Sequence, residues 1–267
     1  MGEHVRTAGP PPGGQDVAAW FAQISQELHA QPAEEPTLER ILEQALNVVH
    51  GDWAGIALRR RRGRWESVAA SAPVVTECDE IQAKLGDGPA LAGEPDQVGL
   101  LCRNTLTDPR MPVWGPLAAS KGVRSVLNLR LVLPRPDGDP RLLGAINIYD
   151  SRISAFTRDD LDRGLVFATH ATRALATARE LEGLEAAISS RHVIGIAQGI
   201  LMQRYCLDQV NAFEALRRYA SASNMKLRDV ARTVIDNGAL ETPHVPAHRE
   251  PDPLGSRPVL PKEELRP

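Results

Sequence analysis

The feature that most constrains the fold is a change of hydrophobic period along the chain. Apolar residues in 16–29 and 37–50 recur at helical spacing. The period then shortens to that of strands over 54–59, 65–70, 125–133 and 144–150, and the helical period returns at Thr157. This order of helices, strands, loops, strands and helices predicts an α+β fold around one antiparallel sheet.

Local signals refine the first half of the chain. Thr37, which follows Pro36, is the predicted N-cap of the helix over 37–50. Arg62-Gly63 is expected to turn the first pair of strands into a hairpin. The run Arg59 to Arg62 is expected at the solvated tip of that hairpin, and a role in steering a nucleic acid is the alternative. Residues 71–124 are rich in glycine and proline and predict short helices and loops.

The helical pattern that begins at Thr157 is unusually long. Thr157 is a predicted N-cap, and Asp159 and Asp160 suit the positive end of the helix dipole. The apolar stripe that follows has alternating steps of three and four: Leu161, Leu165, Ala168, Thr172, Leu175, Leu181, Leu184 and Ile188. Such a seam predicts pairing with a second copy of the chain. The alternative is a helix that covers the sheet with its first half and simply continues.

Residues 191–238 predict three short helices. They span 191–204, 209–222 and 226–237, with Asp208 as the cap of the second and Gly238 as the stop of the third. Phe213 is expected in their apolar centre. The bundle resembles helix-turn-helix units in outline.

The first of these helices carries an unusual polar stripe. Arg191, Gly195, Gln198 and Met202 fall on one face, separate from the apolar face. Gly195 and Gly199 each cost about 1 kcal/mol relative to alanine in a helix, which indicates that another backbone approaches closely. That backbone belongs either to a neighbouring helix or to a nucleic acid. Between residues 191 and 232, seven basic side chains oppose three acidic ones, although the whole chain has a net charge of −3. This local excess is typical of a phosphate-backbone binder, and a solvated helix face is the alternative.

Several classes of protein are disfavoured by what the 267 residues lack. The sequence contains no run of eighteen apolar residues and no apolar segment typical of a secretory signal, so we expect a cytoplasmic protein without a membrane partner. Cys78, Cys102 and Cys206 are far apart and predict neither a disulfide framework nor a metal site. No motif of a hydrolase, P-loop enzyme or zinc protease is present, so we expect no enzyme, no metal and no cofactor. Residues 1–15 and the proline-rich tail 241–267 are expected to be disordered.

Three ordered blocks in the C-terminal region carry a resemblance to a known family. They read IGIAQGILMQRY (194–205), AFEALRRYAS (212–221) and NMKLRDVA (224–231). Together they resemble the ANTAR domain, an RNA-binding transcription-antitermination module, and we place a connecting helix and this domain at 179–240. The resemblance implies a three-helix unit that dimerises through the preceding helix and binds paired hairpin loops in nascent RNA.

By position, the resemblance implies a set of RNA-binding residues on the three helices. They are Arg191, Gln198, Gly199, Met202, Arg204, Arg217, Arg218, Lys226 and Arg228. The commonest form of the domain has AKG where this chain has Ala197-Gln198-Gly199. Because a cation is replaced by a neutral amide, one counterion-release contact is lost, and we expect a weaker affinity for RNA and a smaller dependence on salt.

The region before it, residues 16–178, resembles a GAF sensor domain of the kind that precedes ANTAR in actinobacterial regulators. The resemblance rests on five blocks in order: GDWAGIAL (51–58), LGDGPAL (85–91), DPRMPVW (108–114), GVRSVLNLRL (122–131) and LLGAINIYDSRISAFTRDD (142–160). It implies an antiparallel sheet with flanking helices and a pocket for an unknown small-molecule ligand. Gly86 to Pro89 form either a turn that closes this pocket or a tight turn and nothing more.

The sequence identifies no ligand for the sensor. His50 and His170 are candidate ligands for haem or a metal, although a lone histidine is more often structural, and Cys78 and Cys102 are candidate redox sensors. We therefore expect a dimeric, signal-responsive antitermination regulator that binds RNA hairpin loops. A DNA-binding helix-turn-helix regulator and an adaptor for protein partners remain as alternatives.

Overall fold

A computed structural model describes residues 14–31, 33–92, 97–136 and 138–240, with side chains from Ala19 onward. The chain divides into two compact units, residues 1–186 and 187–267. The division falls within the segment expected as the connecting helix. The two predicted disordered ends, apart from Gly14 and Gln15 in the first helix, lie outside the described residues.

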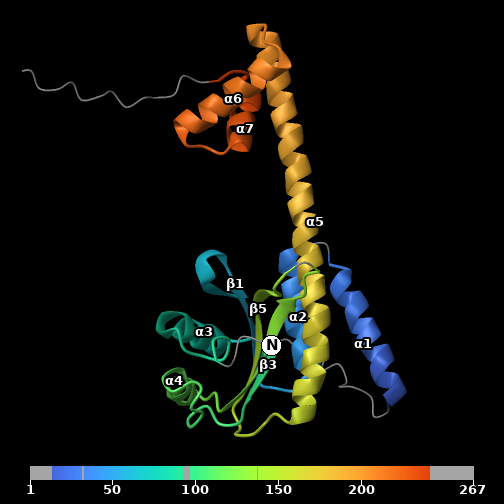
Figure 1. Ribbon diagram of the computed structural model, residues 1–267, viewed down its shortest axis with the longest axis vertical. Helices are drawn as coiled ribbons and strands as arrows, with labels where there is room; N and C mark the ends of the chain where they lie inside the picture. Colours follow the sequence, from blue (N-terminus) through green and yellow to red (C-terminus); the bar gives the residue numbers. More distant parts are fainter. Residues whose placement is uncertain (1–13, 32, 93–96, 137, 241–267) are drawn as a thin grey trace, which may run out of the picture. The chain divides into compact units, whose positions relative to one another are not determined.

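The first unit is built on a five-stranded antiparallel sheet in the order β2-β1-β5-β4-β3 (Figure 1). Its strands are β1 (Trp53–Arg59), β2 (Trp65–Ala70), β3 (Gly99–Cys102), β4 (Ser125–Leu133) and β5 (Arg141–Asp150). Leu58 pairs with Gly144 and Leu127 with Ile148, so β5 lies between β1 and β4. The α+β fold class is thereby confirmed.

Helices cover both faces of this sheet. One face packs against α1 (Gly14–His29), α2 (Glu34–Val48) and the first part of α5 (Arg158–Tyr205), and its core contains Ile56, Leu129 and Phe167. The other face packs against α3 (Pro73–Leu85) and α4 (Trp114–Ser120), with Trp114 and Tyr149 fully buried. Because side chains alternate between the two faces of a β-strand, the sheet contributes to two separate apolar layers.

The start of α2 differs from the prediction. The helix begins at Glu34, and Thr37 lies inside its first turn, where its hydroxyl donates to the Ala33 carbonyl at 2.7 Å. Thr37 is therefore not the N-cap. Proline is tolerated in a first helical turn because its missing N–H has no partner there, so Pro36 does not delay the start of the helix.

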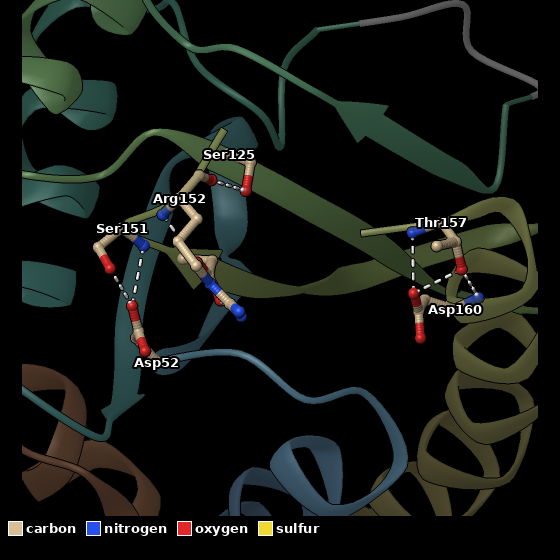
Figure 2. A network of polar contacts seen from close by, with 7 residues as sticks. Asp52, Ser125, Ser151, Arg152, Thr157 and Asp160 are labelled. Carbon is tan, nitrogen blue, oxygen red and sulfur yellow. Dashed lines mark hydrogen bonds and ion pairs between the residues drawn. The ribbon is translucent and has the colours of Figure 1, made fainter. Parts of the chain in front are cut away.

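The predicted start of α5 is confirmed by a reciprocal cap. The Thr157 N–H donates to the Asp160 carboxylate at 2.8 Å, and the Asp160 N–H donates to the Thr157 hydroxyl at 3.2 Å (Figure 2). The connection from β5 is held at its other end by Asp52, which accepts from the Ser151 N–H at 2.9 Å (Figure 2). These bonds fix where the long helix leaves the sheet.

The glycine-rich region 71–124 contains one strand that the sequence pattern missed. β3 has only four residues and pairs along Gly99–Cys102 with β4, which leaves too little alternation to recognise. Gly86 ends α3 in the left-handed conformation, φ 66°, and the next residue, Asp87, accepts from the N–H groups of Val113 and Trp114, each at 2.9 Å. The turn therefore anchors the start of α4.

The second unit is a three-helix cluster. It consists of the end of α5, α6 (Gln209–Ser223) and α7 (Leu227–Asn237). Its core is formed by small and branched side chains: Ala197, Leu201, Ala212, Leu216, Ala220, Val230, Ala231 and Val234. Phe213, expected in this core, is 37 % exposed, because the alanines let the helices approach closely and leave no room for a ring.

Both predicted ends in this unit are confirmed. Asp208 caps α6 by accepting from the Asn211 N–H at 2.7 Å, and Gly238 ends α7 with φ 70°. The helices expected over 157–190 and 191–204 form one continuous helix of 48 residues, α5.

Candidate nucleic-acid interface

The C-terminal part of α5 turns its apolar residues inward and its polar stripe outward. Ala197 and Leu201 are fully buried against α6 and α7. Arg191, Gln198 and Met202 follow at steps of seven and four, which places them within about 40° of one another around the helix axis. Arg191 and Met202 are exposed, and Gln198 is half-buried. The structure therefore brings these three predicted residues onto one stripe.

Two glycines open the backbone beside this stripe. A Cβ added at Gly195 or Gly199 would meet nothing within 4 Å. Within the described part of the chain, no other helix makes use of the close approach that these glycines allow. Because each glycine has a cost in helix stability, their open position favours a partner that comes from outside the chain.

Gln198 also has an internal contact. Its Nε2 donates to the Gln209 carbonyl at 3.2 Å, at the first residue of α6. The amide thus ties the stripe to the start of α6, close to the cap at Asp208. Its Oε1 is an acceptor that can pair with a base edge or a ribose hydroxyl.

The basic residues predicted on the other two helices are exposed, but they differ in their partners. Arg217 donates to Glu214 at 2.8 Å, and Arg228 lies 3.4 Å from the Asp229 carboxylate. Arg218 and Lys226 are exposed and have no ion pair among the described residues. The contact that an arginine makes with an exposed carboxylate is weak, so a phosphate can replace it.

Arg204 is separated from the stripe. It lies more than about 120° around the helix from Arg191 and Met202. Its Nη1 is 3.7 Å from the Cβ that would be added at Gly238, at the end of α7. The predicted site residues therefore comprise one stripe on α5, exposed basic residues on α6 and at the start of α7, and one arginine beside the C-terminus of α7.

Chemically, the stripe combines a guanidinium, an amide, a thioether and exposed helix backbone. These groups suit unstacked bases, which can lie against guanidinium planes and donate to or accept from amides. Arg232, which is also exposed, was absent from the predicted set. It follows Arg228 by four residues on α7 and lies outside the α5 stripe.

A second polar site lies inside the first unit, between the sheet and α3. Asp79 is only 5 % exposed and accepts from the Ser67 hydroxyl at 2.6 Å and from the Tyr149 hydroxyl at 3.4 Å. Burial raises the pKa of Asp79 to about 6, although hydrogen bonds from Ser67, Tyr149 and Asn147 act to lower it. The sequence patterns did not predict a site at Asp79. A charged residue on the inward face of the helix over 73–85, between Val75 and Gln82, is the signal for it.

Asn147 lies near this carboxyl on the same face of the sheet. Its Oδ1 accepts from Asn128 Nδ2 at 2.7 Å, and its own buried Nδ2 acts on the Asp79 carboxyl but makes no hydrogen bond of full geometry with any described residue. A buried amide donor with only a poor acceptor is costly, which makes it a candidate contact for a bound polar molecule.

The candidate ligands for haem, metal or redox chemistry do not form a cluster. His50 is exposed and His170 half-buried, and the described residues contain no group of three side chains able to hold a metal ion. Cys78 and Cys102 are free and buried, and burial raises the pKa of each thiol to about 12, which disfavours the reactive thiolate. None of the described helices has an apolar stretch that would cross a membrane.

Known proteins are similar to both parts of the chain. Residues 182–235 match the ANTAR domain. A phytochrome photosensory core module from Stigmatella aurantiaca has a TM-score of 0.52 at 10 % identity, over 82 % of this chain and 47 % of that one. A bacteriophytochrome from R. palustris has a TM-score of 0.50 at 9 % identity, over 77 % of this chain and 48 % of its own. The chain thus spans about half the length of each.

Smaller solved domains are also similar. The GAF domain of a phosphoenolpyruvate-protein phosphotransferase from Acinetobacter shares 13 % identity over 63 % of this chain and 97 % of that one, with a TM-score of 0.47. None of the curated proteins matches the sequence significantly. The α+β unit, which we call the GAF-like unit after the resemblance in its sequence, has a fold found in photosensory modules, and an ANTAR domain, an RNA-binding antitermination module, follows it.

Proposed function

We propose that this protein is a signal-responsive antitermination regulator whose α5 stripe binds the loops of RNA hairpins. The observation that carries the proposal is the open glycine backbone at Gly195 and Gly199, flanked by Arg191, Gln198 and Met202. A helix surface without side chains, bordered by cationic and amide groups, lets splayed bases approach the backbone. Arg217, Arg218, Lys226 and Arg228 supply the charge that attracts the phosphates.

We further propose that two copies of the chain pair through α5. Leu181, Leu184 and Ile188 are 43 %, 55 % and 66 % exposed, although they continue the apolar seam that is buried at Leu175. Exposed apolar residues at this spacing are typical of a helix that pairs with a partner helix. A two-fold dimer carries two equivalent stripes and therefore prefers two hairpins on one RNA.

A competition experiment tests the class of partner. The full chain is mixed with a pool of RNAs that carry two stem-loops with randomised loops, and the bound RNA is recovered, labelled and challenged at constant salt. We expect duplex DNA of matched length to compete poorly, and an RNA with one hairpin to bind at least tenfold more weakly than the RNA with two. Equal competition by duplex DNA would instead support a DNA-binding regulator.

We propose that the GAF-like unit receives the signal as a small polar molecule. The support is the buried Nδ2 of Asn147, which acts on the Asp79 carboxyl but makes no hydrogen bond of full geometry with any described residue. The RNA affinity of the full chain is measured with and without a filtered small-molecule extract of bacterial cells. We expect the extract to change the affinity of the wild type but not that of Asn128→Leu with Asn147→Leu, in which both amides of the pair are replaced together. An equal response of both proteins would exclude this site.

A further inference from the structure

The GAF-like unit contains a dense group of arginines that has no role in RNA binding by the ANTAR domain. The turn between β1 and β2 is closed by the Arg60 N–H, which donates to the Arg64 carbonyl at 2.7 Å. Arg61, Arg62 and Arg64 are exposed at this turn, and their side chains make no ion pair or hydrogen bond with any described residue. Three free guanidinium groups therefore share one tight turn.

Arg60, in the same turn, differs from these three arginines because it makes contacts within the unit. Its Nε donates to Glu66 at 2.5 Å, and its Nη1 lies 3.5 Å from the Glu34 carboxylate at the start of α2. One arginine of the turn is thus used to hold the hairpin against the rest of the unit. The other three contribute nothing of this kind to the fold, and their mutual repulsion acts against it.

The register of the sheet adds two more cations at the same end. β1 and β5 are antiparallel, and Leu58 pairs with Gly144, so the turn between β4 and β5 lies at the same end of the sheet as the turn between β1 and β2. Arg135 is exposed in that second turn and Arg141 is exposed at the start of β5, while Asp139 is the exposed acidic residue among those of the turn that the structure describes. Arg59, the exposed last residue of β1, lies at this end as well. We call the six exposed arginines together the basic end of the sheet: Arg59, Arg61, Arg62, Arg64, Arg135 and Arg141.

The chemistry of the basic end fits a phosphate backbone. Guanidinium groups stay charged at every physiological pH and bind phosphate oxygens in pairs. An aromatic side chain accompanies them, because Trp65 is half-buried and pairs with Arg59 across the two strands. Arginines next to an aromatic ring are typical of surfaces that bind single-stranded nucleic acid, in which phosphates and bases are contacted together. An acidic peptide would pair with the guanidinium groups but would give the Trp65 ring no partner.

Arg62 has an unusual backbone conformation at the tip of the turn. Its φ of 63° lies in the left-handed region, which is unfavourable for a residue with a side chain. The next residue, Gly63, also has a positive φ, at 75°. Left-handed residues are what a tight hairpin turn requires, so the turn itself accounts for this conformation, and it places the side chain of Arg62 at the exposed tip.

We propose that the basic end of the sheet is a second RNA-contact surface, which binds the backbone of the unpaired strand that flanks the hairpins. This inference rests on the proposed function, because it takes RNA as the partner. It adds a sequence-independent contact from the sensor unit to the loop contacts of the ANTAR domain. A flexible single strand can reach this surface without any fixed arrangement of the two units.

The test compares two variants of the full chain with equal loss of charge. The first is Arg61→Gln with Arg62→Gln and Arg64→Gln. The matched control is Arg103→Gln with Arg158→Gln and Arg173→Gln, three exposed arginines of the same unit, two of which lie at the opposite end of the sheet. Circular dichroism and unfolding curves establish that both variants fold.

Three labelled RNAs separate the possible outcomes. They are a two-hairpin RNA, the same RNA with an unpaired flank of about 20 uridines, and a free uridine strand of about 30 nucleotides. We expect the flank to strengthen binding of the wild type and of the control, and to add nothing for the turn variant. On the uridine strand, the slope of log affinity against log salt falls by about 2 in the turn variant, at about 0.7 for each lost phosphate contact.

Distinct results would overturn the two proposals. Equal binding of the uridine strand by the turn variant and the control excludes the basic end as an RNA surface, whatever happens with the hairpins. Poor discrimination between the hairpin RNA and the uridine strand, with the turn variant still impaired, overturns the loop-binding function and leaves the basic end standing. If polyglutamate displaces the uridine strand at equal charge concentration, the basic end fits an acidic protein instead.

Discussion

The Glu34 carboxylate accepts a hydrogen bond from Arg179 Nη2 at 2.7 Å, and this contact joins the start of α2 to α5 three residues before the ANTAR match begins. The Glu34 N–H also donates to the Glu182 carboxylate at 2.9 Å. Because Arg60 lies against the same Glu34 carboxylate, one acidic side chain links the β1–β2 turn to the long helix. Within the GAF-like unit, this is where a change in the sheet can act on α5.

The Glu34–Arg179 pair is expected to stabilise the unit. The bond to the Arg179 guanidinium lowers the pKa of Glu34 below its usual 4.5. A lowered pKa in the folded state means that the contribution is present above about pH 4.5 and is lost as the pH falls through the folded-state value. In a double-mutant cycle of Glu34→Gln and Arg179→Met, urea unfolding near pH 7 should give a coupling of about 1–2 kcal/mol. A coupling that does not weaken near pH 3 would contradict this account.

Asp79 should have the opposite pH dependence. Burial raises its pKa to about 6, so the folded state favours the neutral carboxyl. The contribution of this neutral carboxyl to the free energy of unfolding is therefore complete below the ordinary pKa of 3.8 and is lost as the pH rises through about 6. Asp79→Asn should therefore raise the free energy of unfolding by about 1–3 kcal/mol at pH 7.5 and by little at pH 4. Chemical denaturation at the two pH values measures this change. Asp87→Asn is the control, because Asp87 caps the start of α4, so that variant should have a lower free energy of unfolding than the wild type. A pH-independent effect of Asp79→Asn would refute the assignment.

The two open glycines of α5 should separate stability from binding. Gly195→Ala and Gly199→Ala each remove the entropic cost of glycine and meet no atom within 4 Å, so each should stabilise the domain by about 0.5–1 kcal/mol. If RNA approaches the bare backbone, the same substitutions should lower RNA affinity at least tenfold. Thermal unfolding and fluorescence anisotropy on the same samples measure both effects. Improved stability with unchanged RNA affinity would show that RNA does not contact the backbone at these glycines.

Gln198 offers a gain-of-function test. Gln198→Lys adds a cation to the stripe and should raise both RNA affinity and the salt slope, the latter by about 0.7 to 0.9 for one further phosphate contact. Gln198→Met keeps the length of the side chain, loses the bond to the Gln209 carbonyl and should weaken binding. Affinity titrations at several salt concentrations distinguish the two. If the lysine variant keeps the wild-type slope, position 198 does not face a phosphate.

Particular elements show how far sequence reasoning reaches. The reciprocal cap of Thr157 and Asp160, the cap at Asp208 and the stop at Gly238 were all predictable, because each depends on residues within a few positions of one another. β3 and Asp79 were not. β3 is a strand only because β4 pairs with it, and the burial of Asp79 depends on Ser67 and Tyr149, which are distant in sequence.

The candidate site shows the same division. The periodicity of a single helix placed Arg191, Gln198 and Met202 on one stripe, which is their position in the structure. The resemblance grouped Arg204 with them, and only the packing of α7 against the end of α5 separates it, beside Gly238. Phe213 was misplaced because apolar character does not reveal how much room the neighbouring alanines leave.

The most direct test of the central claim reverses one charge on the α5 stripe and one elsewhere in the same domain. Arg191→Glu and Arg232→Glu change the net charge equally, and both side chains are exposed. Fluorescence anisotropy with the selected two-hairpin RNA should show a loss of about a hundredfold for Arg191→Glu, equivalent to about 2.7 kcal/mol, and a loss of only a few-fold for Arg232→Glu. Equal losses for the two variants would mean that only net charge matters, and would contradict the assignment of the α5 stripe as the surface that holds the RNA loops.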